Sequence, residues 1–271
     1  ITEGDKRLDT TLSEIGGKGL FTEELEEGLR AGSLDLAVHS LKDLPTAMPD
    51  GLVLGAILPR ANAGDVLMAA SGKQFKSLAD LPVGAKIGTA SLRRAAQIMH
   101  LRPDCEIAPM RGNVGTRLKK LDSEGFDATI LAAAGLARLG IELAEATLLS
   151  ADDILPAAGQ GALAVQCRAD DAAMRAHLGA LHCADTHDCV TAERSFLAAL
   201  DGSCRTPIAA FARLSDGELT LTGRLLSDDG RLMAQGVIKA AREKADETGR
   251  ALASELAEKM QVLRRDKGLG E

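Results

Sequence analysis

The sequence predicts an α/β fold made of two similar α/β units and a smaller α+β unit at the C-terminal end. Three observations predict it. The chain has 271 residues, 45% of them hydrophobic, which is enough for two or three separate cores. In its middle part, short apolar strands alternate with helices, as in a mainly parallel sheet covered on both faces. Near the end, the turn SDDG at 227–230 separates two apolar runs and predicts an antiparallel hairpin.

The first unit contains an apolar strand at 34–38, LDLAV, and a second strand at 52–58. Asparagine and glycine in 61–65 then predict a hinge before a new unit. After GQG at 159–161, the apolar run ALAVQC at 162–167 predicts another strand. We expect this strand to return to the first sheet.

The second and third units differ in the order of their elements. In the second, we expect strands near 86–87, at 105–110 and at 128–132, with helices at 92–101 and 114–121. In the third, we expect a helix at 186–200, strands at 208–213, 218–226 and 231–239, and a long amphipathic helix at 241–263. The third unit therefore has the pattern of an α+β domain with an antiparallel sheet.

Composition excludes several classes of partner. The net charge is −7 and the chain has no Trp, no Tyr and five Phe, so it lacks the basic surplus and the stacking platforms of a nucleic-acid binder. No apolar run approaches the roughly 18 residues of a membrane span, and the first residues do not resemble a signal peptide. Five scattered cysteines without a C-x-x-C pair indicate reduced thiols. We therefore expect a cytoplasmic protein that binds neither nucleic acid nor membranes.

Positive charge is concentrated in the middle of the chain. Between Lys86 and Arg138, nine Lys or Arg stand against five Asp or Glu, so this stretch carries +4 and the remainder −11. In open α/β sheets, ligands bind beyond the carboxyl ends of the strands. The polar residues that follow the predicted strands are His39, Ser40, Lys42, Asp43, Thr89, Ser91, Arg93, Arg94, Arg111 and Asn113.

These residues predict a binding site for a ligand with several carboxylates. Ser91 and Asn113 are candidate helix N-caps, so the neighbouring arginines would lie at helix N-termini, which favour anions. The planar guanidinium group binds a carboxylate at two points. In a ligand site, Asp43 could stabilise a developing positive charge. The alternatives are that the arginines are solvated surface charges and that Asp43 is an ordinary turn residue.

Cys204 is the candidate nucleophile of the chain. It lies in GSCRTPI at 202–208, where the adjacent Arg205 would favour the thiolate. The alternative is a buried, inert thiol.

Two other motifs suggest different chemistry. Two histidines and two cysteines occur within 182–189, but their spacing matches no zinc motif, and we expect no metal site. The glycine-rich GGKGLF at 16–21 lacks the complete nucleotide-binding pattern, so we expect a loop that presents Lys18.

Six segments taken together resemble the porphobilinogen deaminase family, also called hydroxymethylbilane synthases. In the order in which they occur, they are GGKGLF at 16–21, VHSLKDLP at 38–45, GTASLRR at 88–94, RGNVGTR at 111–117, PAAGQGALAVQCR at 156–168 and GSCRTPI at 202–208. The resemblance implies two periplasmic-binding-protein-like domains with mainly parallel mixed sheets, and a small α+β domain with a three-stranded antiparallel sheet. It implies boundaries at 1–61 with 162–180, at 66–157 and at 184–271.

The resemblance also implies an activity and a set of site residues. The enzyme would join four porphobilinogen molecules head to tail, releasing ammonia, on a dipyrromethane primer held by a thioether to Cys204, and would then hydrolyse the product to a linear tetrapyrrole. Asp43 would be the catalytic residue, in a cytoplasmic monomer. Substrate and cofactor would be bound by Lys18, Ser40, Lys42, Thr89, Ser91, Arg93, Arg94, Arg111, Arg117, Arg138 and Gln160.

Two departures from the family pattern carry expectations of their own. The family has a further strand and helix before the position of Ile1, so we expect an incomplete first sheet and weak primer binding from the sequence as given. The loop SCRTP at 203–207 replaces the common GCQVP, which leaves the thiol in place but changes its neighbours. Two rival functions stay open at this point: a non-catalytic anion-binding module with an unmodified Cys204, and a metal protein that uses the cluster at 182–189.

Overall fold

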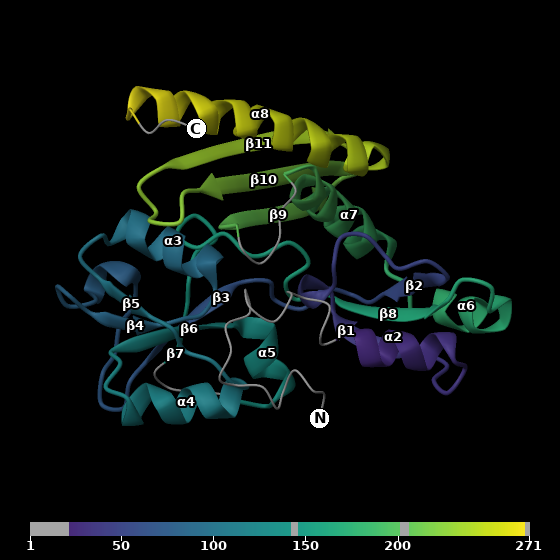
Figure 1. Ribbon diagram of the computed structural model, residues 1–271, viewed down its shortest axis with the longest axis horizontal. Coiled ribbons are helices and arrows are strands. Elements are labelled where there is room, and N and C mark those ends of the chain that lie inside the picture. The colour runs from purple at the N-terminus through teal and green to yellow at the C-terminus, as the bar shows by residue number, and fades with distance from the viewer. Residues whose placement is uncertain (1–21, 142–145, 201–205, 269–271) are drawn as a thin grey trace.

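The computed structural model describes residues 22–141, 146–200 and 206–268, and it contains three sheets that form three lobes (Figure 1). The first sheet has the order β1-β8-β2, in which β1 is Ala37–Ser40, β8 is Leu163–Arg168 and β2 is Leu52–Ile57. Helix α2 (Glu23–Arg30) packs across these strands, and α6 (Ala172–Gly179) packs against β2 and β8. The return of the chain as β8 to the first sheet was predicted and is confirmed.

The second sheet has the order β5-β4-β6-β3-β7. Its strands are β3 (Asp65–Ala69), β4 (Lys86–Gly88), β5 (Glu106–Ala108), β6 (Ala128–Ala132) and β7 (Ala146–Leu148). Its helices are α3 (Leu92–Leu101), α4 (Val114–Ser123) and α5 (Ala133–Arg138). Short 3-10 turns occur at Leu41–Asp43, Leu78–Asp80 and Arg242–Lys244.

Both faces of the second sheet are covered, because its strand residues alternate between two cores. Leu67 packs with Ile98 of α3 on one face. Its neighbours Val66 and Met68 pack with Leu121 of α4 on the other. A strand that is buried on both faces needs apolar residues at successive positions, which is the pattern of β3.

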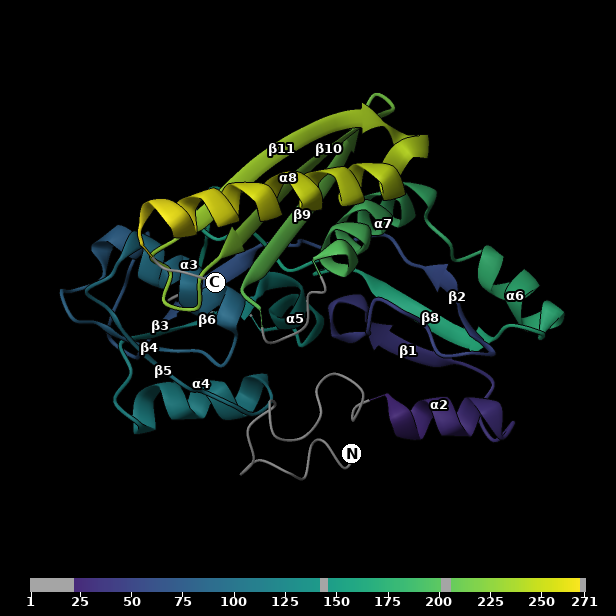
Figure 2. The ribbon, with the colours of Figure 1, turned by 45° about the horizontal axis from the view of Figure 1, so that its top comes forward.

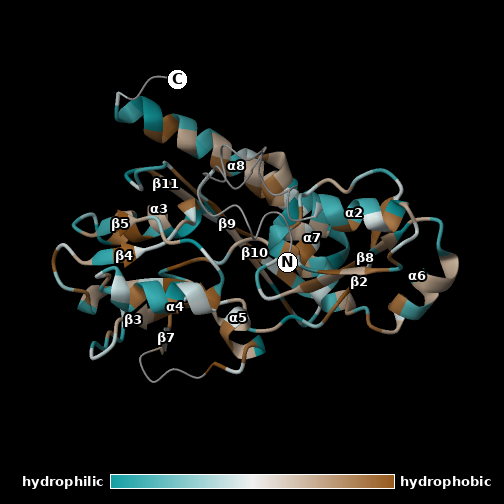
Figure 3. Ribbon diagram, turned by 60° about the horizontal axis from the view of Figure 1, so that its bottom comes forward, coloured by the Kyte–Doolittle hydropathy of each residue, from teal (hydrophilic) through white to brown (hydrophobic). Residues whose placement is uncertain are grey.

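The third sheet has the order β11-β10-β9 and is antiparallel throughout. It consists of β9 (Ile208–Ser215), β10 (Glu218–Leu226) and β11 (Met233–Ala241), and α7 (Ala184–Ala199) and the long α8 (Ala245–Asp266) pack against it (Figure 2). Phe196, Leu221 and Leu252 meet in its core. Hydrophobic and hydrophilic residues alternate along helix α8 (Figure 3), and its buried residues Leu252, Leu256 and Met260 pack in the same core as the strands of the sheet.

The expected direction of the strands needs a correction. Mainly parallel mixed sheets were predicted, but in the first sheet both described pairings, β1 with β8 and β8 with β2, are antiparallel. In the second sheet, β4 pairs in parallel with β5 and β6, whereas β3 pairs antiparallel with β6 and β7. The physical reason is that β3 and β8 enter their sheets from long crossing segments between the lobes, and not from a helix that brings the chain back in the same direction.

Two crossing segments, at 58–64 and 156–162, connect the first and second sheets and lie side by side. The backbone N–H of Ala61 donates to the carbonyl of Gly161 at 3.2 Å. Gly161 has a φ of +90°, and a Cβ atom there would lie 2.7 Å from the Ala61 carbonyl oxygen, so the close approach requires glycine. The segment 61–65, predicted as a hinge, is one of these two connections.

None of the helices in the part of the chain that the structure describes is long and apolar enough to cross a membrane.

Candidate functional site

Lys42 and Asp43 lie in the 3-10 turn that follows β1. Leu41 and Leu44, on either side of them, are each 1% exposed, so they anchor the turn in the core of the first lobe. Lys42 is consequently half-buried and Asp43 exposed, while Ser40 ends the strand immediately before them. Lys42 and Asp43 thus lie directly beyond a strand end, as predicted, whereas His39 and Ser40, which were predicted to follow a strand at 34–38, belong to β1 itself.

Helix α3 begins beyond the end of β4 and carries Arg93 and Arg94 in its first turn. The predicted N-cap is confirmed, since the Ser91 hydroxyl accepts a hydrogen bond from the Arg94 backbone N–H at 3.4 Å. The Thr89 hydroxyl accepts from the Ser91 N–H at 3.1 Å. Thr89 and Ser91 therefore hold the turn that sets the direction of both arginines.

Both arginines converge on Asp65, the first residue of β3. Arg94 donates from Nε at 3.1 Å and from Nη2 at 2.6 Å to Asp65 Oδ1, and Arg93 Nη1 lies 2.8 Å from Oδ2. Gln160 Nε2 donates to Oδ1 at 2.9 Å. Asp65 is 0% exposed. Burial alone would raise the pKa of the Asp65 carboxyl, but the charges and hydrogen bonds of Arg93 and Arg94 outweigh it and hold this pKa well below its usual range.

Lys42 and Asp43 of the first lobe interact electrostatically with arginines of the second. Burial, and then the charge of Arg94, lower the pKa of Lys42 to about 8, while Asp43 opposes the shift. The pKa of Arg117 on α4 is likewise lowered by burial and by Arg94, and raised by Asp43. Groups that shift one another's pKa values in this way are close enough for their charges to interact. We call Lys42, Asp43, Arg93, Arg94 and Arg117 the Asp43 cluster.

Of the other predicted residues, Gln160 contacts the cluster, since its Oε1 accepts from Arg93 Nη2 at 3.4 Å. Gln160 bridges the crossing segments, since its Nε2 also donates to the Ala63 carbonyl at 2.7 Å. Arg138 is exposed and donates from Nη2 to the Gly161 carbonyl at 2.8 Å. Arg111 is half-buried before α4. Lys18 and Cys204 lie outside the described residues.

The sequence did not single out two buried carboxylates that organise the site. Asp65 is one. Glu193 on α7, 0% exposed, is the other: it accepts from Arg60 Nη1 at 2.6 Å, from the Gly159 N–H at 2.7 Å and from the Ala212 N–H at 2.7 Å. Glu193 thus joins the third lobe to both crossing segments. An acidic residue at the start of a wholly apolar strand, as at Asp65, was the available signal, because a buried carboxylate requires cationic partners.

The cluster at 182–189 does not gather around one point. The rings of His182 and His187 are 5.1 Å apart, but Cys189 is buried and Cys183 only half-buried. Burial is the main reason that the pKa of the Cys189 thiol rises to about 11. Within residues 22–141, 146–200 and 206–268, no group of three or more potential metal ligands comes together.

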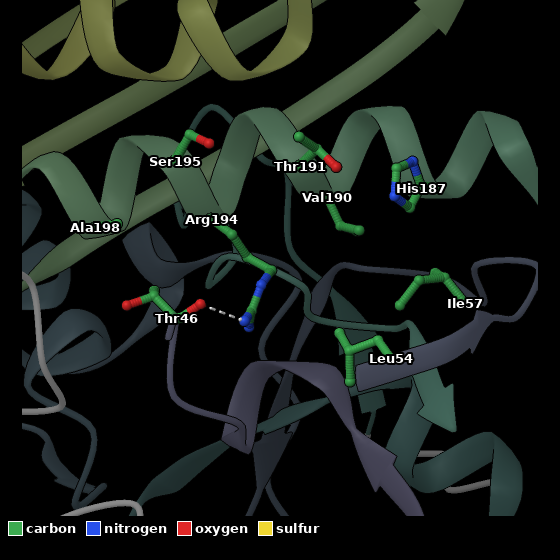
Figure 4. Close-up of a pocket in the computed structure, with 9 residues that line it drawn as sticks. All are labelled: Thr46, Leu54, Ile57, His187, Val190, Thr191, Arg194, Ser195 and Ala198. Atoms are coloured by element: carbon green, nitrogen blue, oxygen red, sulfur yellow. Dashed lines mark hydrogen bonds between the residues drawn. The ribbon is translucent and has the colours of Figure 1, made fainter. Parts of the chain in front are cut away.

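A separate pocket of 240 Å³ lies between α7 and the first sheet (Figure 4). Arg194 enters it from α7 and donates from Nη2 to the carbonyls of Pro45, at 2.7 Å, and Thr46, at 3.0 Å. Leu54, Ile57 and Val190 form its apolar side. None of the predicted site residues lines it.

The fold and the cluster together define a class: a multidomain α/β protein with a cationic site where two lobes meet. A family model described as "Porphobilinogen deaminase, dipyromethane cofactor binding domain" matches residues 1–176. A second, described as "Porphobilinogen deaminase, C-terminal domain", matches residues 187–258. We refer to the third lobe below as the C-terminal domain.

Curated relatives agree with the family models. A porphobilinogen deaminase of Syntrophobacter fumaroxidans is 49% identical over 94% of this chain and 82% of that protein. One of Geobacillus kaustophilus is 46% identical over 100% of this chain and 87% of that protein. Among solved structures, an amino acid ABC transporter substrate-binding protein of Streptococcus pneumoniae gives a TM-score of 0.35 at 14% identity, over 60% of this chain and 65% of that one. This TM-score indicates only a distant structural likeness.

The chain belongs to the porphobilinogen deaminase family. It is a transferase of porphyrin biosynthesis that uses porphobilinogen as its substrate and dipyrromethane as its cofactor. The predicted family and function are therefore confirmed, as is the α/β fold with a C-terminal three-stranded antiparallel sheet.

Proposed function

We propose that the porphobilinogen deaminase reaction takes place at the Asp43 cluster, with Asp43 as the catalytic residue. The observation that carries the proposal is that Lys42 from the first lobe and Arg117 from the second both interact electrostatically with the exposed Asp43 carboxylate, while Arg93 and Arg94 act on Lys42. Each pyrrole of the substrate carries two carboxylates, and cations with planar or flexible donors suit them.

The residues of the cluster fit the cofactor as well as the substrate. Dipyrromethane has the same carboxylate side chains, so Lys42, Arg93, Arg94 and Arg117 would hold it, with Lys18, Arg111 and Arg138 as further cations. Ser40, Thr89, Ser91 and Gln160 would support these contacts. When bound, dipyrromethane supplies the nucleophilic pyrrole carbon on which the product grows.

Asp43 has the right charge and position to act on the substrate. Porphobilinogen develops positive charge as it loses ammonia, and a carboxylate placed beside that charge stabilises it more than it stabilises the neutral ground state. Asp43 would also orient the substrate by accepting a hydrogen bond from the pyrrole N–H. Because Asp43 is exposed, the incoming ring can reach it without unfolding of the surrounding turn.

We propose Cys204 as the point of attachment of the cofactor. The segment GSCRTPI supports this because it keeps the cysteine of the family's loop, as does a cationic neighbour that favours the thiolate. We also propose that domain 1 comprises 1–61 and 162–180, domain 2 comprises 66–157 and domain 3 comprises 184–271. Apart from Asp65 at the start of β3, the strands of the three sheets fall within these ranges, which supports the division. A monomeric state and a cytoplasmic location belong to the same proposal.

Intact mass of the purified protein tests the attachment. The parent protein and a Cys183→Ser control should both carry the mass of two linked pyrroles, and Cys204→Ser should not. Cys183 is a suitable control because it is a half-buried free thiol that is not among the predicted site residues. A Cys204→Ser protein that keeps the added mass would overturn the assignment.

A further inference from the structure

Arg224 joins the C-terminal domain to the helix that carries Arg93 and Arg94. It lies on β10 and is 6% exposed. Its Nη1 donates to Gln97 Oε1 at 2.8 Å and to the Asp153 carbonyl at 2.9 Å, its Nη2 donates to the Asp152 carbonyl, and its Nε donates to Gln235 Oε1 at 2.7 Å. All these acceptors are neutral oxygens. Burying the Arg224 guanidinium among neutral acceptors costs desolvation free energy. A purely apolar contact could hold β10 against α3 without that cost.

Gln97 connects Arg224 to Arg93. It is 1% exposed and lies one helical turn after Arg93 on α3. Its Oε1 also accepts from the Leu155 N–H at 2.9 Å, and its Nε2 donates to the carbonyls of Leu155, at 3.1 Å, and Arg93, at 3.2 Å. The same Leu155 carbonyl accepts from Arg93 Nη1 at 2.6 Å. Arg224 thus reaches the Arg93 guanidinium through one side chain and one carbonyl.

The turn of the β10–β11 hairpin, which carries Arg224 on its first strand, provides a second contact to α3. His100 Nδ1 donates to the Gly230 carbonyl at 2.8 Å. Gly230 has a φ of +70°, and a Cβ atom there would lie 2.4 Å from the Ala96 carbonyl oxygen and 2.8 Å from the His100 nitrogen. The hairpin therefore contacts α3 at three places, Ala96, Gln97 and His100, and its end lies beside α3 in both Figure 1 and Figure 2.

We propose that Arg224 is a positioning residue for the condensation: through Gln97 and the Leu155 carbonyl it acts together with Asp65 and Gln160 to fix the direction of the Arg93 guanidinium. The C-terminal domain, which holds Cys204, would thereby set the geometry of a carboxylate-binding arginine in the other lobe. The inference rests on the proposed role of Arg93 in binding carboxylates. A guanidinium that is held in one orientation loses less conformational freedom when it binds its ligand, so the effect belongs to substrate binding.

Steady-state kinetics of the complete holoenzyme with porphobilinogen test the inference. Arg224→Lys should raise KM about tenfold and leave kcat within about threefold, because Arg93 binds carboxylates equally in the ground and transition states. Gln97→Met breaks the connection but keeps the contacts of Arg224 to the carbonyls of Asp152 and Asp153, and it should raise KM to a similar extent. Arg231→Lys, on the same hairpin with a side chain that is 84% exposed, is the matched control and should leave both constants unchanged.

A double-mutant cycle separates a positioning role from a structural one. In an Arg93→Lys background, Arg224→Lys should change KM by less than about twofold, since the group through which it acts is gone. If the two effects multiply, or if Gln97→Met leaves KM unchanged, the positioning role of Arg224 is wrong while the proposed role of Arg93 stands. If Arg93→Lys itself has the parent KM, the assignment of Arg93 and this inference are both overturned.

Discussion

Replacing Asp65 with asparagine should destabilise the protein more than any exposed charge change would. The substitution removes the carboxylate that two buried arginines share, at 2.6 Å for Arg94 and 2.8 Å for Arg93. A pair of unit charges about 4 Å apart interacts by about 4 kcal/mol at an effective dielectric constant of about 20. Part of this is offset by desolvation, and removal of one partner of a buried ion pair costs about 3–5 kcal/mol. That corresponds to a fall in melting temperature of roughly 6–20 °C.

The stability lost in Asp65→Asn should decrease as the pH falls. Because the native pKa of Asp65 is held below its unfolded value, the stabilisation is fully present above about pH 4–5 and is lost as the pH falls through the native pKa. Urea unfolding of parent and Asp65→Asn should therefore show a constant difference in unfolding free energy from pH 8 to pH 5, and a smaller one below about pH 4. A difference under about 1 kcal/mol at pH 7, or one that grows on acidification, would refute this reasoning.

Three other perturbations probe the site and its supports. Lys42 has a pKa of about 8 and should lose its charge between about pH 7 and pH 9. KM for porphobilinogen should therefore rise over that interval in the parent and change less in Lys42→Arg, because arginine stays charged. Parallel profiles of KM against pH in the two proteins would contradict this. Glu193→Gln should cost about 3–5 kcal/mol in urea unfolding because Arg60 loses its buried partner, whereas Glu255→Gln, with a side chain that is 43% exposed, should cost under about 0.5 kcal/mol. Gly161→Ala should cost about 1–3 kcal/mol because of its φ of +90° and the nearby Ala61 carbonyl, and an unchanged melting temperature would argue against that strain.

Local signals in the sequence predicted the regular elements well. The bounds of α3, β6 and β10 agree with the prediction, because each has a strong apolar period and a clear stop or cap, such as Ser91 before α3. Helices α2, α5 and α6 and strands β3 and β7 were not predicted. All five are short, and only packing against neighbouring elements gives such segments enough stability to form.

The candidate site could be predicted in its composition but not in its internal pairing. The sequence placed Lys42, Asp43, Arg93 and Arg94 beyond strand ends, and the structure brings these groups together. It could not show that Arg93 and Arg94 lie buried on Asp65, because that contact joins residues 28 and 29 positions apart across a sheet. The direction of β8 was equally inaccessible, since it depends on how the crossing segment returns and not on the apolar pattern of ALAVQC.

The central claim is that the Asp43 carboxylate promotes the loss of ammonia from porphobilinogen. Porphobilinogen consumption by primer-loaded Asp43→Asn tests it most directly, with intact mass verifying that the primer is attached and with the exposed Asp50→Asn as control. Turnover should fall about 10²–10³-fold in Asp43→Asn, the scale for removal of one preorganised electrostatic contact, and stay at the parent level in Asp50→Asn. Turnover of primer-loaded Asp43→Asn within about threefold of the parent would contradict the claim.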